Sequence, residues 1–286
     1  MTNAQLMTEA ARGRIGVFDS GLGGLTVAQA ITRLLPDEDL VYLGDTARVP
    51  YGTRSPHTVL RYARSCAAHL REREIKVLVV ACNTVSAVAL EMLRVELDIP
   101  VLGVIEPGAR AGVEACHGRR VLGVIATQGT VASGAYVRAT AALSSRVELV
   151  ARAAPLLVPL AEEGWLEGEV PRLVVESYLE PLKKEGIGAL ILGCTHYPLL
   201  RETIERETAR LCGSDVRVVD SADATAADLA RLLEERALLA PRGAGGSIRI
   251  LVTDRPDRFL QVASRFLGRA IRDDEVEQID LVTESG

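Results

Sequence analysis

KVLVVACNT, at Lys76–Thr84, is a short apolar run that ends at a cysteine followed by small polar residues, and GALILGCTH, at Gly188–His196, repeats this design. Apolar runs of this length, rich in Val, Ile and Leu, are typical of parallel strands buried on both faces. Open α/β sheets bind ligands at the carboxyl ends of their strands, where each cysteine falls. One such cysteine would most simply pack in the core. The repeat instead favours a facing pair of thiols, one on each side of a substrate carbon.

The bulk composition bounds the class of protein. The chain has 286 residues, 48% hydrophobic residues, a mean hydropathy of +0.17 and a net charge of −5. It is long and apolar enough for one large or two smaller α/β domains, and its charge argues against direct nucleic-acid binding. No stretch approaches the ~18 apolar residues of a membrane span, and residues 1–13 lack the apolar core of a signal peptide. We expect a cytosolic protein, not associated with a membrane, with a loose N-terminal extension at residues 1–13.

The cysteine count argues for free thiols. Five cysteines without a secretion signal do not indicate a disulfide framework, and the absence of a CxxC pair makes a zinc site improbable, so we expect no metal. Three of them, together with His57, His69 and His117, are assigned to packing or to the surface. Those three cysteines are Cys66, Cys116 and Cys212.

Alternating strand and helix patterns predict an α/β fold of two pseudo-symmetric lobes, each a mostly parallel sheet flanked by helices. Asp19 and Cys82 are 63 residues apart, and Thr127 and Cys194 are 67 apart, so the pattern is duplicated. We expect a first lobe at 14–106 plus 217–286, a second lobe at 107–216, and an active site in the cleft between them. Predicted strands are Arg14–Phe18, Leu40–Leu43, Val101–Val104, Val147–Arg152, Val216–Asp220 and Ile248–Val252, and predicted helices are Leu25–Leu34, Ser55–Arg73, Ser86–Glu96, Pro171–Glu185, Ser221–Leu238 and Pro256–Phe266.

The glycine-rich turn DSGLGG, at Asp19–Gly24, follows the first strand. It differs from the dinucleotide fingerprint GxGxxG, and its acidic residue precedes the glycines instead of following about 20 residues later. Nucleotide binding is therefore disfavoured. Nothing in the chain resembles a flavin, nicotinamide or pyridoxal phosphate site, so we expect no cofactor.

Two thiols can perform proton transfer without a cofactor. A thiolate is a usable base because its unperturbed pKa is ~8.5, and we expect helix N-termini to lower the pKa of both Cys82 and Cys194. Asp19 could hydrogen-bond or accept a proton near Cys82, and His196 could do so near Cys194. Bases on opposite faces of a carbon favour racemisation or epimerisation. The polar residues Ser20, Asn83, Thr84 and Thr195 suit a substrate carboxylate and the charge that develops on the carbon acid.

Four motifs resemble one known family and occur in its order and spacing. They are DSGLGG at Asp19–Gly24, GDTARVPYG at Gly44–Gly52, ACNT at Ala81–Thr84 and GCTHYPLL at Gly193–Leu200. Over about Arg14 to Asp220 the chain is similar to the glutamate racemases of the aspartate/glutamate racemase superfamily. The resemblance implies a cofactor-independent, two-base interconversion of L- and D-glutamate that supplies D-glutamate for peptidoglycan, in a cytoplasmic homodimer.

The resemblance also assigns site residues. It implies that Cys82 and Cys194 are the two bases and that Asp19 and His196 assist them. Glu162 matches an acidic residue near the family's active site, although Ala154 stands where family members often have a cysteine. The positions that match the family's substrate pocket are Ser20, Pro50, Tyr51, Gly52, Asn83, Thr84, Thr127, Thr130 and Thr195.

Three other readings stay open. One is a related enzyme of the superfamily, such as a racemase acting on aspartate or a hydantoin, or a decarboxylase or isomerase. Decarboxylase relatives use a single cysteine, so the presence of two cysteines argues against a decarboxylase. The second is a regulatory binding protein on the same fold, because some glutamate racemases are associated with inhibition of DNA gyrase and residues 1–13 could serve such a partner. The last, a thiol hydrolase using Cys194 and His196, leaves Cys82 and the repeat unexplained.

Overall fold

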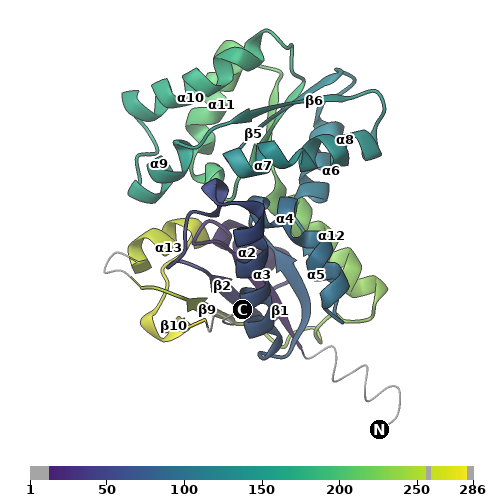
Figure 1. The fold of residues 1–286 in the computed structure, drawn as a ribbon, viewed down its shortest axis with the longest axis vertical. Coiled ribbons are helices and arrows are strands. Elements are labelled where there is room, and N and C mark those ends of the chain that lie inside the picture. The colour runs from purple at the N-terminus through teal and green to yellow at the C-terminus, as the bar shows by residue number, and fades with distance from the viewer. Residues whose placement is uncertain (1–12, 256–258, 282–286) are drawn as a thin grey trace.

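Two parallel sheets, one in each of two lobes, organise this computed structural model, which describes residues 13–255 and 259–281 (Figure 1). The larger sheet has the order β10-β9-β2-β1-β3-β4, and all of its pairings are parallel. Its strands are β1 (Arg14–Asp19), β2 (Leu40–Gly44), β3 (Ile75–Val80), β4 (Val101–Gly103), β9 (Ile248–Val252) and β10 (Val276–Gln278).

The smaller sheet repeats four consecutive strands of the larger one, from β2 to the edge strand β4. Its order, β6-β5-β7-β8, matches β2-β1-β3-β4 strand for strand, again with parallel pairing throughout. This correspondence bears out the duplicated pattern in the sequence, because the two cysteine-bearing runs form β3 and β7. Its strands are β5 (Val121–Ala126), β6 (Glu148–Ala153), β7 (Ala189–Gly193) and β8 (Arg217–Asp220).

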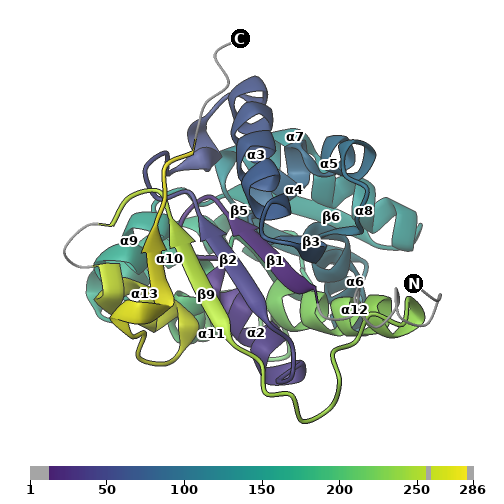
Figure 2. The same ribbon diagram turned by 90° about the horizontal axis from the view of Figure 1, so that it is seen from below.

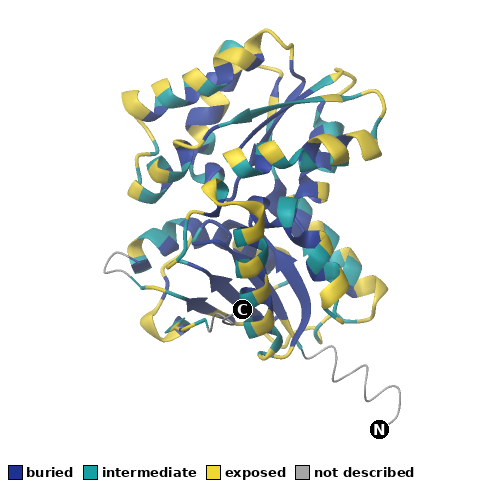
Figure 3. Cartoon of the chain, in the orientation of Figure 1, coloured by how far each residue is buried: buried dark blue, intermediate teal, exposed yellow. Residues whose placement is uncertain are grey.

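The central strands of the larger sheet are largely apolar on both faces, and helices cover both (Figures 2 and 3). In β1, Ile15 and Val17 pack in one core cluster, whereas Phe18 packs in the other, as the two-residue period of a strand requires. The first face carries α2 (Leu25–Leu34), α12 (Ser221–Glu235) and α13 (Phe259–Leu267), and the second carries α3 (Pro56–Arg71), α4 (Asn83–Val88) and α5 (Leu90–Glu96).

The second lobe is layered in the same way, and its core is continuous with that of the first. Leu190 and Leu192 of β7 belong to the cluster that also contains Ile15 and Val17 of β1, so apolar packing joins the lobes. None of the described helices is long and apolar enough to cross a membrane. The helices of this lobe are α6 (Ile105–Ala115), α7 (Gln128–Ser133), α8 (Ala135–Leu143), α9 (Leu157–Glu163), α10 (Glu169–Lys183) and α11 (Arg201–Leu211). Across both lobes the described chain also forms the 3-10 turns η1 (Tyr51–Thr53), η2 (Tyr197–Leu200) and η3 (Asp273–Glu275).

Several sequence-based boundaries need correction. The expected return to the first lobe at residue 217 is too early, because β8 pairs with β7 and the chain leaves the smaller sheet only after Asp220. The predicted helix Ser86–Glu96 is two helices that meet at Ala89, and the first begins at Asn83, directly after Cys82. The short edge strand β10 was not predicted. Residues 256–258 of the last predicted helix, and residues 1–12 of the extension, lie outside the described residues.

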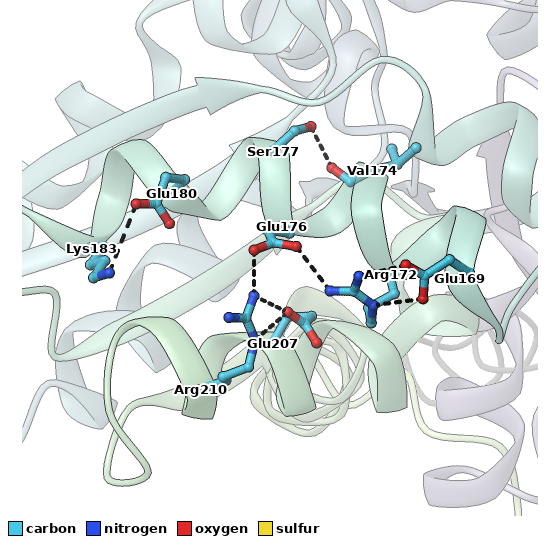
Figure 4. Close-up of polar contacts among 9 residues, drawn as sticks. All are labelled: Glu169, Arg172, Val174, Glu176, Ser177, Glu180, Lys183, Glu207 and Arg210. Atoms are coloured by element: carbon cyan, nitrogen blue, oxygen red, sulfur yellow. Dashed lines mark hydrogen bonds and ion pairs between the residues drawn. The ribbon is translucent and has the colours of Figure 1, made fainter.

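A charged network joins α10 to α11 on the outside of the second lobe (Figure 4). Arg210 bridges Glu176 and Glu207 at 2.8 and 2.6 Å, and Arg172 bridges Glu169 and Glu176 at 2.8 and 2.9 Å. The guanidinium groups of Arg210 and Arg172 hold the pKa of Glu176 below its usual range. Networks of this kind fix helix register at the surface, and each exposed pair contributes little to stability.

Candidate active site

The matched topology brings the two cysteines to equivalent positions. Cys82 follows β3 and is the N-cap residue of α4, and Cys194 follows β7 directly, ahead of η2. Each residue is only 6% exposed. Both thiols therefore lie at carboxyl ends of parallel strands, one on each lobe, as the sequence predicted. Cys194 precedes a 3-10 turn, so the expected helix N-terminus exists only at Cys82.

The Cys82 thiol is strongly held in its protonated form. Burial raises its pKa to about 12, and the nearby charge of Asp19 adds to the effect. The hydrogen bond that Sγ makes to Ser20 Oγ, at 3.4 Å, and the backbone N–H of Val85 act in the opposite direction but are weaker. The expectation that a helix N-terminus lowers this pKa is therefore wrong, because the desolvation of a buried thiolate outweighs the helix dipole.

Cys194 has a cationic partner. Its Sγ lies 3.8 Å from His196 Nδ1, and His196 Nε2 lies 3.0 Å from Glu162 Oε1. Burial alone would lower the pKa of His196, but its contacts with Cys194 and Glu162 more than offset this and raise the pKa to about 10. His196 is therefore an imidazolium at neutral pH, and its positive charge lies beside Cys194 Sγ. The rings of His196 and Phe266 pack in a T-shaped arrangement, with centroids 5.2 Å apart.

Asp19 links the two lobes. Its buried carboxylate accepts hydrogen bonds from Gly21 N at 3.0 Å and from Thr195 Oγ1 at 3.4 Å, and Thr195 follows Cys194. Burial raises the pKa of Asp19, although His196 and backbone N–H groups oppose the shift. A Cβ added at Gly23 would collide with Thr195 Oγ1 and His196 Nδ1. The glycine-rich turn therefore lets the lobes approach closely, which explains its composition without a bound phosphate.

Threonines from both lobes form a second contact across the cleft. Thr84 of α4 lies 2.9 Å from Thr127 and 3.3 Å from Thr130, measured between hydroxyl oxygens, and Thr127 lies 2.9 Å from Thr130. A Cβ added at Gly52 would lie 2.8 Å from Thr127 Cβ, so the η1 segment also touches the second lobe. Four of the predicted pocket residues are thus brought together. Beside them, Asn83 is buried and accepts a 2.7 Å hydrogen bond from Tyr136 of α8.

Tyr51 and Pro50 have no direct hydrogen bond to the two cysteines of the site or to the threonine contact in the described residues. The Tyr51 hydroxyl donates to the buried carboxylate of Asp45, which also accepts from Arg48 Nε at 2.6 Å and from Thr253 Oγ1 at 2.9 Å. Its phenol is committed to this network, and Pro50, after a cis peptide bond, is exposed. Their contact with substrate stays a prediction. Sequence reasoning missed Asp45, although it lies inside the motif GDTARVPYG.

Two surface pockets reach the rim of this site. One, of about 250 Å³, is lined in part by Gly21 and Glu162, and another, of about 310 Å³, is lined in part by Gly52 and Thr84. Among residues 13–255 and 259–281, no group of three or more His, Cys, Asp or Glu side chains is arranged to hold a metal ion.

Two parallel-sheet lobes of matching strand order, each with a buried cysteine at an equivalent strand end, define the class of α/β protein. A sequence profile for Asp/Glu/Hydantoin racemase matches residues 15–229. The glutamate racemase of Geobacter metallireducens is 50% identical over 270 residues, which cover 94% of this chain and 97% of that protein. The glutamate racemase of Syntrophus aciditrophicus is 46% identical, covering 90% and 93%.

Solved structures agree with the sequence comparison. A glutamate racemase isoform from Bacillus anthracis superposes with a TM-score of 0.88 at 40% identity, covering 94% of this chain and 98% of its own. The Francisella tularensis glutamate racemase, solved with D-glutamate, gives 0.86 at 36% identity and covers 95% and 98%. The chain belongs to the Asp/Glu/hydantoin racemase family.

Proposed function

We propose that this protein is a glutamate racemase that interconverts L- and D-glutamate without a cofactor. The observation that carries the proposal is the pair of buried thiols, Cys82 and Cys194, at equivalent strand ends with unlike partners. The glutamate racemases of Geobacter metallireducens and Syntrophus aciditrophicus, to which most of the chain aligns, support the choice of substrate.

The proposed reaction is one proton transfer on each face of Cα. Cys194, acting as a thiolate beside His196, removes the α-proton, and the electron pair of the C–H bond passes toward the substrate carboxylate. The Cys82 thiol, protonated at neutral pH because its pKa is about 12, delivers its own proton to the opposite face. The enzyme is left with a thiol at Cys194 and a thiolate at Cys82, which is the arrangement needed for the reverse reaction.

The polar residues next to the thiols would bind the substrate. Asn83, Thr84 and Thr195 lie beside the cysteines in sequence and supply an amide, hydroxyls and backbone N–H groups for a carboxylate. Each cysteine is buried, and the lobes touch through the threonine contact described above. We therefore propose that substrate enters when the lobes move apart and that closure excludes water from the carbanion.

We further propose that the protein acts as a homodimer in the cytoplasm and supplies D-glutamate for peptidoglycan. An interaction with gyrase would depend on the N-terminal extension, of which residues 1–12 lie outside the described residues.

A substrate panel tests the proposed function. Purified protein, dialysed free of small molecules, is mixed separately with L-glutamate, L-aspartate and an L-hydantoin, and loss of circular dichroism is followed. Loss with glutamate alone is the expected result. Loss only with aspartate or the hydantoin would move the assignment to another branch of the family, and inertness toward all three would favour the regulatory protein.

A further inference from the structure

One hydrogen bond between the lobes has no part in the chemistry described so far. The hydroxyl of Tyr136, at the start of α8 in the second lobe, donates to Asn83 Oδ1 at 2.7 Å, and Asn83 opens α4 in the first lobe. Both residues are almost fully buried, Asn83 at 2% and Tyr136 at 3% exposure. Asn83 directly follows Cys82, so this bond ends one residue from a proposed base.

The other end of the same carboxamide is unsatisfied. In the described part of the chain, Asn83 Nδ2 is buried and has no hydrogen-bond partner. A buried amide group without a partner is costly, and it is retained where a ligand supplies the missing acceptor. A carboxylate oxygen of the substrate would be such an acceptor. Nδ2 can donate to the substrate only while the carboxamide oxygen stays toward Tyr136. Rotation of the carboxamide by half a turn would exchange the positions of Oδ1 and Nδ2.

Tyr136 is well placed to prevent that rotation. Burial raises the pKa of its hydroxyl, which therefore keeps its proton and acts as a donor to an oxygen. The hydroxyl also lies where the two connections between the lobes begin. A Cβ added at Gly108 of α6 would be 3.4 Å from Tyr136 Oη and 3.0 Å from Ser221 Cβ at the start of α12. The hydroxyl thus lies beside α6, close to the point where α12 begins.

We propose that Tyr136 is a positioning residue that fixes the Asn83 carboxamide with its NH₂ group presented to a carboxylate of the substrate. This inference rests on the proposed racemase function, since it names the group that orients one substrate donor of that site. Tyr136 does not touch the reacting atoms. Its effect passes through Asn83, so it should alter substrate binding far more than proton transfer.

Steady-state racemisation of L-glutamate by the full chain tests the proposal. Loss of a donor to a charged oxygen in Asn83→Ala should raise KM on the order of 10- to 100-fold. Tyr136→Phe leaves the amide present but free to rotate, and should raise KM about 5-fold while kcat changes by less than about 2-fold. In the double variant KM should equal that of Asn83→Ala, because Tyr136 has nothing left to orient.

Tyr197→Phe is the matched control. It also removes one buried 2.8 Å hydrogen bond, from the tyrosine hydroxyl to the carbonyl of Ala154, and should lower thermal stability by a similar amount with KM unchanged. The proposal is overturned if KM is unchanged in Tyr136→Phe, or if it rises equally in Tyr197→Phe. It is also overturned if the KM effects of Tyr136→Phe and Asn83→Ala multiply in the double variant.

A further variant covers the case in which Tyr136→Phe does not fold. Asn83→Asp keeps an acceptor for Tyr136 but replaces NH₂ with a second acceptor, so it should stay folded and lose calorimetric binding of glutamate at least 10-fold; wild-type binding would refute the proposal. Racemisation by the unaltered protein judges the proposed function separately. If that protein is inert toward glutamate, the proposed function fails, and calorimetric binding of glutamate by Tyr136→Phe, compared with Tyr197→Phe and the unaltered protein, still decides whether Tyr136 orients a carboxylate donor.

Discussion

Replacing Glu162 by Gln removes the charge that helps to keep His196 protonated while preserving the size of the side chain. The carboxylate oxygen lies 3.0 Å from His196 Nε2, and the side chain is 38% exposed. A hydrogen bond to a charged group contributes about 1.5–3 kcal/mol, which equals about 1–2 pKa units. Because solvent screens this half-exposed carboxylate, we expect the smaller value. The pKa of His196 should therefore fall from about 10 by about one unit.

Proton NMR of the imidazole Cε1–H signals measures this change. The chain has only four histidines, and His196→Gln identifies the signal of interest. Glu163→Gln is the matched control, since it makes the same charge change at the next, exposed residue. It should leave the titration of His196 unchanged. Titration of His196 near pH 6.5 in the unaltered protein, or an equal shift in both variants, would refute the interpretation of the Cys194–His196–Glu162 contacts.

The same shift has a consequence for stability. The pKa of His196 in the folded state, about 10, lies above its ordinary value of 6.5. Protonation therefore stabilises the fold fully below pH 6.5, and this contribution is lost as the pH rises through about 10. In urea denaturation, the difference in unfolding free energy between the unaltered protein and Glu162→Gln should be present at pH 7 and vanish above pH 10. A difference that grows with pH would contradict the sign.

Two further predictions concern the fold and the cleft. Lys76→Met should lower the free energy of unfolding by about 3–5 kcal/mol in urea denaturation, because it leaves the buried Glu38 carboxylate without the ammonium group 2.6 Å away. Lys183→Met, which removes an exposed pair, should cost less than about 1 kcal/mol, and equal losses would refute the distinction. Gly52→Ala should raise KM for glutamate several-fold without lowering Tm, because its Cβ would lie 2.8 Å from Thr127 Cβ and hinder closure of the lobes. An unchanged KM would show that these two segments separate in the substrate complex.

The sequence was sufficient for the features that depend on short patterns. Uninterrupted apolar runs identified β3 and β7 because a strand buried on both faces has no polar side to interrupt it. The cysteine at the end of each run then located both thiols, and the repeat predicted two similar lobes. Edge strands were harder. β8 was assigned to the wrong lobe, since pairing with β7 or with the larger sheet leaves the same local pattern.

The electrostatics and the contacts between lobes could not be predicted from local patterns. The pKa of Cys82 is raised because the rest of the structure removes water from its thiol, whereas its sequence neighbours indicated only a helix N-terminus. Asp19 lies near Cys82 as expected, but its hydrogen bond from Thr195, 176 residues away, could not be predicted from the local sequence. No local pattern assigns a role to Tyr136, and its contact with Asn83 becomes visible only once the lobes are docked.

Deuterium exchange in the two cysteine variants tests the two-thiol assignment most directly. In deuterated water, the unaltered protein should bring deuterium into Cα of L-glutamate while the circular dichroism signal falls. Cys82→Ser and Cys194→Ser should each lose nearly all racemisation, because one face of Cα then lacks its acid or base. Each should still exchange the α-proton of one enantiomer, and the preferred enantiomer should differ between the two variants. Racemisation at the wild-type rate in either variant, or the same preference in both, would contradict the assignment.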